Sequence, residues 1–408
     1  MPNDEKGLSR RDFLKAAGTA GAGSVLAAAG SLAQSRANAS ESEPEITQVP
    51  KRAFGKTGVD VSILSLGGMF DISSNQLMLR QALKWGVTYW DTADCYEGGN
   101  SELGIGQYFK RYPDTRKEVF LVTKSDSRDV EGMTQLLERS LERMSTNYID
   151  LYFIHGMRSI DEIGTATKAW AEKAKSAGKI KFFGFSTHSN MEQLMMDAAK
   201  LGWIDGIMMS YNFRLMQTDK MKAAVEACAK AGIGLTAMKT QGGSWISRVL
   251  ESELELTDRF IKLGYTDKQA KLKAVWENTD IASICSQMPN MSILTTNIAA
   301  AINRTRLSAK ELNLLEHYAR ETASDYCAGC TAICEPCLAS SVPIGDIMRY
   351  YMYYQSYGDH DLARALFAEI DQTTRDRLLS LDYSEAERKC PQRIKIARRI
   401  EEATIVLG

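Results

Sequence analysis

Four side chains in the first half of the sequence are of types that could together move a proton to or from a substrate oxygen. Each follows a short apolar run directly or within a few residues: Asp91, Tyr96, Lys124 and His155. Taken singly, the aspartate is typical of a helix cap, the lysine of a solvated strand end and the histidine of a core hydrogen bond. Their order after three successive runs instead predicts a catalytic set.

A lysine close to a tyrosine would give this set its chemistry. The unperturbed pKa of tyrosine is about 10, too high for an efficient general acid near neutrality. An ammonium about 4 Å away favours the phenolate by roughly 4 kcal/mol, or about 3 pKa units, at an effective dielectric constant near 20. We therefore expect Lys124 to lower the pKa of Tyr96 towards about 7, Asp91 to pair with Lys124, and His155 to orient a substrate carbonyl. The set fits protonation of a carbonyl oxygen as hydride arrives at its carbon, or the reverse.

The eight cysteines form two groups. Cys95, Cys228 and Cys285 are far apart in the sequence, and we expect them to be small core residues. The second group is C-terminal: Cys327, Cys330, Cys334, Cys337 and Cys390. Spacings of two and three residues suit disulfides and metal ligands alike, so the pattern alone leaves both open.

Eight short apolar runs between residues 51 and 306 predict the strands that position these side chains. The runs cover residues 62–66, 89–90, 119–122, 151–154, 182–185, 207–209, 234–238 and 281–285. Helical stretches alternate with them; in the clearest, Met133, Leu137 and Leu141 recur on one helical face. Eight alternating units predict a closed (β/α)8 TIM barrel over residues 51–324, with catalytic groups at the carboxyl ends of its strands. A hairpin turning at Gly55–Gly58 is expected to plug the barrel bottom.

The first 39 residues read as an export signal. Residues 9–15, SRRDFLK, form a twin-arginine motif, a Gly/Ala-rich stretch follows to Ala33, and Ala37-Asn38-Ala39 offers a cleavage site. Residues 40–50 would then be a linker. An uncleaved membrane anchor is the alternative, but the stretch is short and glycine-rich for a span of about 20 apolar residues. We expect a periplasmic protein with no stable membrane span after cleavage.

In the barrel region the sequence resembles the aldo-keto reductases. The motifs that carry the resemblance are Gly55-Lys56-Thr57-Gly58, Asp91…Tyr96, Gly99-Asn100-Ser101-Glu102, Thr123-Lys124, Ile154-His155 and Gly184-Phe185-Ser186-Thr187-His188. The resemblance implies a catalytic tetrad of Asp91, Tyr96, Lys124 and His155, and NAD(P) across the barrel mouth.

The residues implied to bind this cofactor depart in part from the family pattern. They are Ser186, Thr187, Tyr211, Lys239, Asn290 and Asn297. Thr187 stands where the family usually has Asn, and Met208 where it usually has Gln. Gln287 and Ile293 occupy positions that commonly carry cations for the 2′-phosphate. A preference for NADP over NAD is therefore not expected.

Within an expected C-terminal domain of residues 325–408, residues 326–396 resemble a ferredoxin module, as found in a subgroup of these reductases. The resemblance implies one [4Fe–4S] cluster on Cys327, Cys330, Cys334 and Cys390, with Cys337 as an alternative ligand. A second cluster is not expected, because Ser380, Tyr383 and Ala386 replace three of its ligands. A structural zinc ion, or metal-free thiols and disulfides, are the alternatives.

The overall expectation is an exported oxidoreductase acting on a small carbonyl or alcohol, with a small α-helical, cysteine-rich, ferredoxin-like C-terminal module for electron relay or structure. A redox partner protein would accept or supply the electrons. The alternatives are a non-catalytic redox sensor or electron-transfer protein on the same scaffold, and an enzyme that relays electrons from the cluster without nicotinamide. The formal net charge of −1 gives no reason to expect binding to nucleic acid.

Overall fold

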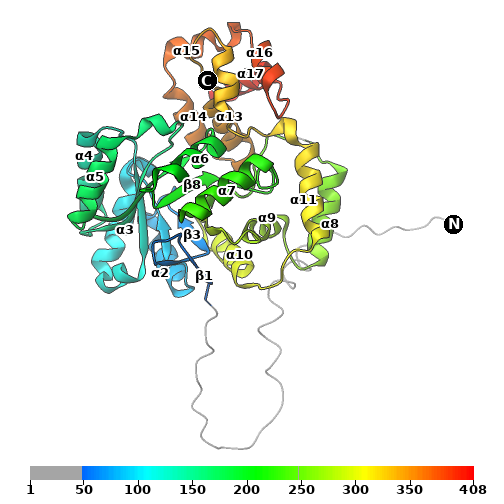
Figure 1. Ribbon diagram of the computed structural model, residues 1–408. Coiled ribbons are helices and arrows are strands. Elements are labelled where there is room, and N and C mark those ends of the chain that lie inside the picture. The colour runs from blue at the N-terminus through cyan, green and yellow to red at the C-terminus, as the bar shows by residue number, and fades with distance from the viewer. Residues whose placement is uncertain (1–47, 247) are drawn as a thin grey trace, which may run out of the picture.

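A computed structural model describes residues 48–246 and 248–408 (Figure 1). The twin-arginine motif, the cleavage site and the first eight residues of the expected linker lie outside the described residues. In the described part, no helix combines the length and the apolar character needed to cross a membrane.

Eight parallel strands close into a barrel, as the sequence predicts. They are β3 (Leu64–Gly67), β4 (Tyr89–Asp91), β5 (Phe120–Ser125), β6 (Ile149–Ile154), β7 (Ile180–Thr187), β8 (Gly206–Ser210), β9 (Gly234–Met238) and β10 (Ile281–Gln287). The strands follow one another around the barrel in chain order, and β10 pairs with β3 to close it. The carboxyl ends of all eight strands therefore meet at one mouth, where side chains far apart in sequence come together.

Helices surround the barrel. They are α2 (Gln76–Lys84), α3 (Asn100–Arg111), α4 (Val130–Arg143), α5 (Thr165–Ser176), α6 (Met191–Leu201), α7 (Asp219–Ala231), α8 (Glu251–Lys262), α9 (Asp267–Trp276), α10 (Met291–Ile302) and α11 (Ala309–Glu321). Helix α4 shows how the sequence builds one: Asp129 caps it by accepting a hydrogen bond from the Gly132 amide at 2.7 Å, and Met133, Leu137 and Leu141 are buried against the strands.

An antiparallel hairpin of β1 (Lys51–Ala53) and β2 (Asp60–Ser62) closes the barrel bottom. Phe54 is fully buried and packs with Tyr89 and Phe120 inside the barrel. Gly55 follows it with a positive φ of 54°, and a Cβ there would lie 2.3 Å from the carbonyl oxygen of Gly232. Only glycine satisfies both the backbone conformation and the close approach.

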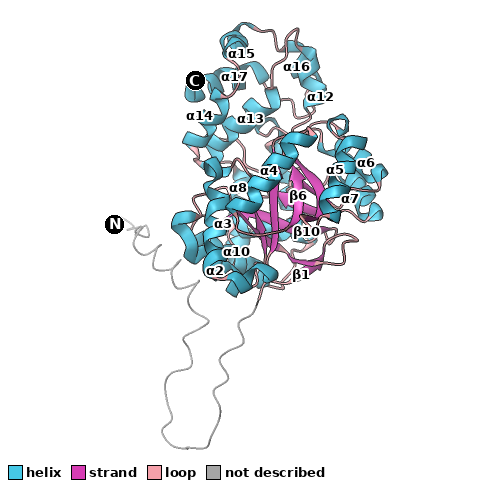
Figure 2. Ribbon diagram, turned by 90° about the vertical axis from the view of Figure 1, so that its left-hand side faces the viewer, coloured by secondary structure: helices cyan, strands magenta, loops and turns pink. Residues whose placement is uncertain are grey.

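The C-terminal residues form a helical unit with its own core, here called the module (residues 326–408). Its helices are α12 (Thr331–Cys334), α13 (Ile344–Met352), the π-helical segment η7 (Tyr353–Tyr357), α14 (His360–Ala368), α15 (Gln372–Arg377), α16 (Ser384–Lys389) and α17 (Ile396–Leu407). Figure 2 shows the module stacked on one end of the barrel.

Polar contacts fix the module to the loops at the barrel mouth. The Asn190 amide donates to the Gly329 carbonyl at 2.8 Å, and the Asn212 side chain donates to the Tyr326 hydroxyl at 3.0 Å. Arg158 of the β6–α5 loop pairs with Asp346 of α13. Trp245, from the β9–α8 loop, belongs to the hydrophobic core of the module. The module therefore covers the carboxyl ends of the strands.

Candidate active site at the barrel mouth

Asp91, Tyr96, Lys124 and His155 come together at the barrel mouth. Asp91 ends β4, Lys124 lies near the end of β5, and His155 directly follows β6. The Lys124 ammonium donates to Asp91 Oδ2 at 2.7 Å, to the Thr92 carbonyl at 2.7 Å and to the Tyr96 hydroxyl at 3.3 Å. The rings of Tyr96 and His155 pack edge to face, with centroids 5.7 Å apart. One ammonium thus joins the predicted general acid to a buried carboxylate.

The expected lowering of the pKa of Tyr96 is not found. Burial raises the pKa of the Tyr96 phenol above its usual value, and Lys124 offsets only part of this effect. The sequence analysis expected Asp91 to pair with Lys124 but gave burial too little weight: burial outweighs Lys124, and the negative charge of Asp91, 2.7 Å from the same ammonium, also opposes the phenolate. Although burial alone would lower the pKa of Lys124, Asp91 raises it. Near neutrality the site therefore holds a protonated Tyr96 beside a charged Lys124.

His155 has a second set of neighbours that the sequence analysis missed. Its Nδ1 atom is 2.9 Å from Asp126 Oδ1 and 3.7 Å from Cys95 Sγ. Burial lowers the pKa of the imidazole, and the hydrogen bond with Asp126 opposes this only in part. Asp126 directly follows β5, two residues after Lys124. A polar residue at the carboxyl end of a barrel strand is a candidate site residue, and this position could have identified Asp126 from the sequence.

Ser186 and Thr187, implied to hold a carboxamide, are both buried at the end of β7. Ser186 Oγ accepts a hydrogen bond from the Gly156 amide at 3.0 Å, and its own hydroxyl hydrogen has no acceptor within the described part of the chain. Thr187 Oγ1 donates to the Ser189 carbonyl at 2.8 Å and accepts from the Ser189 amide at 3.1 Å. Ser186 is therefore free to donate to a ligand, whereas the Thr187 hydroxyl is engaged in its own turn.

Three other residues implied to bind cofactor are engaged within the protein. Tyr211 is buried, and its hydroxyl accepts a hydrogen bond at 2.9 Å from the side chain of Asn278, which lies just before β10. Asn290 caps α10 by accepting from the Ile293 amide at 3.0 Å, and the Asn297 amide group donates to the Ser286 hydroxyl at 3.0 Å. Tyr211 directly follows β8 at the mouth, and its hydroxyl is engaged by Asn278, so its implied contact with the cofactor stays a prediction.

Lys239 does face the mouth, in a pocket of about 510 Å³ shared by barrel and module. His188, Ser210 and Lys239 line it from the barrel, and Met348, Arg349 and Tyr357 line it from the module. The Lys239 ammonium lies 4.2 Å from the centre of the Tyr353 ring. Although burial would raise the pKa of Tyr353, Lys239 and Arg349 bring it below its usual value. The module therefore supplies part of the mouth, which no local pattern in the sequence indicated.

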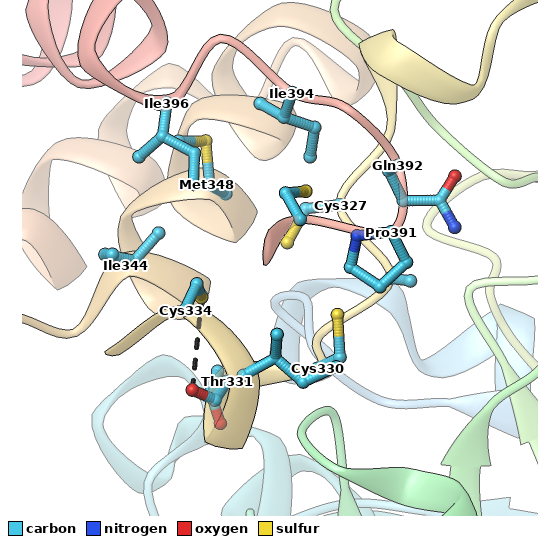
Figure 3. A pocket seen from close by; sticks show the side chains of 14 residues that line it. Cys327, Cys330, Thr331, Cys334, Ile344, Met348, Pro391, Gln392, Ile394 and Ile396 are labelled. Atoms are coloured by element: carbon cyan, nitrogen blue, oxygen red, sulfur yellow. Dashed lines mark hydrogen bonds between the residues drawn. The ribbon is translucent and has the colours of Figure 1, made fainter. Parts of the chain in front are cut away.

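A second pocket of about 380 Å³ lies within the module (Figure 3). Cys327, Cys330, Cys334 and Cys390 line it together with apolar residues that include Ile344 and Ile396. Cys337 is outside this lining, and its thiol faces the Ile333 carbonyl at 3.2 Å. All eight cysteines are in the described part of the chain, and none of them forms a disulfide there.

The three remaining cysteines differ from one another. Cys228 is fully buried, in line with the expectation of a core residue. Cys285 is partly exposed, with its thiol 3.7 Å from Asp91 Oδ2. Cys95 is exposed, so its assignment to the core was wrong: it lies on the turn between β4 and Tyr96, at the mouth.

Comparisons with known proteins agree with this geometry. Residues 64–296 match the sequence profile of the Aldo/keto reductase family. The chain is 26% identical over 305 residues to an uncharacterized oxidoreductase, YqkF, of Bacillus subtilis, covering 66% of this chain and 97% of that protein. It is 22% identical over 300 residues to L-galactose dehydrogenase of Arabidopsis thaliana, covering 66% and 94%. The aldo-keto reductase AKR11C1 of Bacillus halodurans superposes with a TM-score of 0.56 at 23% identity, covering 66% and 96%.

Proposed function

Because the chain belongs to the aldo/keto reductase family, we propose that it transfers hydride between a nicotinamide cofactor and the C=O or CH–OH carbon of a small substrate. The observation that carries the proposal is the buried series Asp91–Lys124–Tyr96 at the mouth. The catalytic residues are Asp91, Tyr96, Lys124 and His155. Bound nicotinamide would supply the hydride or accept it.

The residues at the mouth fit a nicotinamide dinucleotide. Ser186 retains a free hydroxyl hydrogen for a carboxamide oxygen, and Lys239 is a cation on the loop after β9 that would hold phosphate. Lys239 adopts a positive φ of 55°, unusual outside glycine and typical of strained functional positions. A requirement for the 2′-phosphate of NADP is not part of the proposal.

The protein side chains handle the proton. In the reductive direction Tyr96, protonated at neutral pH, donates its hydroxyl hydrogen to the carbonyl oxygen as hydride reaches the carbon. Lys124 donates a hydrogen bond to the phenolate that forms, and Asp91 keeps Lys124 charged and in place. His155 positions the substrate oxygen beside Tyr96, whose ring it contacts.

We further propose that the module binds one [4Fe–4S] cluster through Cys327, Cys330, Cys334 and Cys390. The four thiols line one pocket with otherwise mostly apolar walls. Zinc would require sulfurs about 3.8 Å apart, from Zn–S bonds of about 2.3 Å in a tetrahedron. Within the described residues, no three of these sulfurs lie within 4.8 Å of one another. A cubane places each thiolate on a different iron, so its four ligands need not converge on one ion.

Cys327 also connects the two sites. It lines both the cysteine pocket and the pocket at the barrel mouth. A cluster held by this residue would stand next to whatever the mouth binds. This arrangement favours electron relay over a purely structural role, with a redox partner protein outside.

The proposal includes export by the twin-arginine route, which carries folded proteins. A periplasmic enzyme has little free nicotinamide to draw on, so the dinucleotide would bind in the cytoplasm and stay bound. Protein isolated from the periplasm should then carry close to one dinucleotide per chain through gel filtration.

One observation favours a second function. The module packs onto the loop after β9, where a Cβ on Gly243 would lie 2.7 Å from Ser356 Oγ, and Tyr353 stacks under Lys239. The phosphate of a nicotinamide dinucleotide would have to fit beside Lys239 in space that the module partly occupies. An enzyme that exchanges electrons between the cluster and a substrate at the mouth, without nicotinamide, is therefore the alternative.

Three measurements on anaerobically purified protein test these proposals. Tyr96→Phe should reduce turnover of a carbonyl panel with NADH or NADPH by about 10²–10⁴-fold; unchanged turnover would refute the assigned acid. Iron analysis should give about four atoms per chain, and eight irons, or zinc in place of the iron, would contradict one cluster. Cys390→Ser should make the cluster labile while Cys337→Ser leaves it intact; the opposite result would overturn the ligand assignment.

A further inference from the structure

A compact group of three potential metal ligands lies at the mouth, separate from the cysteine pocket. Cys95 follows β4, Asp126 follows β5, and His155 follows β6, so three neighbouring strands deliver one residue each. The thiol sulfur, a carboxylate oxygen and a ring nitrogen all lie within 4.8 Å of one another. No step of the proposed reaction uses Cys95 or Asp126.

The separations within this group suit a transition-metal ion. A tetrahedral ion with bonds of about 2.0–2.3 Å holds its nitrogen, oxygen and sulfur ligands roughly 3.3–3.8 Å apart. His155 Nδ1 is 2.9 Å from Asp126 Oδ1 and 3.7 Å from Cys95 Sγ, so small side-chain rotations would bring all three onto one ion. The Asp126 and Cys95 side chains reach solvent, so an ion can enter.

Arg128 already holds the backbone of two of the three ligand residues in place. The Arg128 guanidinium donates to the Asp126 carbonyl at 2.8 Å and to the His155 carbonyl at 2.8 Å. Arg128 is itself held by Glu162 at 2.9 Å. One guanidinium thus ties together the backbone of two residues on adjacent strands, the kind of support that orients ligands in metal sites.

We propose that Cys95, Asp126 and His155 bind one zinc-class divalent cation at the barrel mouth, with a fourth coordination position left open. A thiolate, an imidazole and a carboxylate form a borderline-soft ligand set, which selects zinc over magnesium or calcium. The thiol releases its proton to solvent on binding. Thiolate and carboxylate then balance the charge of the ion.

The cation would change what His155 offers to a substrate, a consequence that rests on the proposed function. Without metal, the 2.9 Å contact with Asp126 places the imidazole hydrogen on Nδ1 and leaves Nε2 as an acceptor. A metal ion on Nδ1 places the hydrogen on Nε2, which becomes a donor. A donor suits a substrate carbonyl and an acceptor suits an alcohol, so the ion would favour binding of the carbonyl over the alcohol.

Cobalt(II) provides the test, because a thiolate–Co²⁺ bond gives an intense charge-transfer absorption. The full chain with its iron–sulfur module loaded is titrated with Co²⁺, and difference spectra are recorded. Wild type and Cys337→Ser, a matched thiol control outside the site, should each show the band with one Co²⁺ bound. Cys95→Ser should lose the band, and Arg128→Gln should weaken binding about 10–100-fold, as when other groups that orient metal ligands are removed.

A band that persists in Cys95→Ser, or its absence in wild type, would overturn the site. With ¹⁵N-labelled histidine, of which the chain has four, Zn²⁺ should move the proton of one imidazole from Nδ1 to Nε2 in wild type but not in Cys95→Ser. Tyr96→Phe separates this proposal from the proposed function: it should bind Co²⁺ normally while losing turnover.

Discussion

The ammonium of Lys124 lies 3.3 Å from the hydroxyl of Tyr96. Burial raises the pKa of Tyr96, and Asp91, 2.7 Å from the same nitrogen, opposes the effect of Lys124, so the tyrosine is protonated near neutrality. Lys124 then stabilises the phenolate that forms during the reaction. Both Lys124 and Asp91 are almost completely buried, with 1% and 2% of their side chains exposed. This ion pair therefore has a structural consequence as well as a catalytic one.

Lys124→Met should lower the free energy of unfolding by about 3–5 kcal/mol, because it leaves the Asp91 carboxylate buried without a partner. Lys181→Met is the matched control: Lys181 pairs with Asp150 at 2.8 Å, but half of its side chain is exposed. Losing this exposed ion pair should lower the free energy of unfolding by less than about 1 kcal/mol. Urea unfolding monitored by circular dichroism measures both. Equal losses of stability in the two variants would mean that burial does not determine how much the Lys124–Asp91 pair contributes to the free energy of unfolding.

Gly55→Ala should destabilise the protein more than Gly58→Ala, although both glycines have positive φ in one turn. At Gly55 a Cβ would lie 2.3 Å from the Gly232 carbonyl oxygen and 2.5 Å from the Gly234 amide, so the hairpin must move from the barrel bottom. At Gly58 nothing lies within 4 Å, leaving only the backbone penalty of about 1 kcal/mol. Thermal unfolding of the two variants should show a larger fall in Tm for Gly55→Ala. Equal shifts would contradict the close approach.

The strands and the catalytic residues could be predicted because their signals are local. Each barrel strand is an apolar run that ends in a polar residue, and parallel closure brings such ends together whatever the helices do. The pKa of Tyr96 was mispredicted because it depends on the competition between burial, Lys124 and Asp91, which only the packed site reveals.

The remaining differences are long-range. Cys95 was placed in the core from its residue type, but the turn after β4 carries it to the surface. The resemblance implied that Tyr211 binds the cofactor, but no local pattern could show that its hydroxyl bonds to Asn278, 67 residues away. The pairing of Lys239 with Tyr353 depends on how the module docks, and no periodicity within either segment encodes that contact.

Tyr353 should ionise below the usual tyrosine pKa of about 10. Lys239 and Arg349 favour the phenolate and outweigh the effect of burial, so removing one cation with Lys239→Met should move the ionisation to higher pH. The difference in tyrosinate absorbance near 295 nm between wild type and Tyr353→Phe isolates this residue. The depressed pKa contributes stability above about pH 10 that is lost as the pH falls through the folded-state value. Ionisation of Tyr353 at or above the usual value would contradict the arrangement.

Wild-type protein should bind NAD and NADP with comparable affinity, because Gln287 and Ile293 supply no cation for a 2′-phosphate. Ile293 is exposed in the first turn of α10, where the helix dipole favours an anion, so Ile293→Arg should add one charge-assisted contact. Such a contact contributes about 1.5–3 kcal/mol, or roughly tenfold or more in Kd for NADP. Ala299→Arg is the control, since that exposed position lies six residues further along the same helix, about 9 Å from Ile293. Titrations with NADPH and NADH followed by nicotinamide fluorescence should show tighter NADPH binding for Ile293→Arg alone, with NADH binding unchanged. An equal gain in both variants would indicate a nonspecific charge effect, and no gain in either would place the adenosine end of the cofactor elsewhere on the barrel.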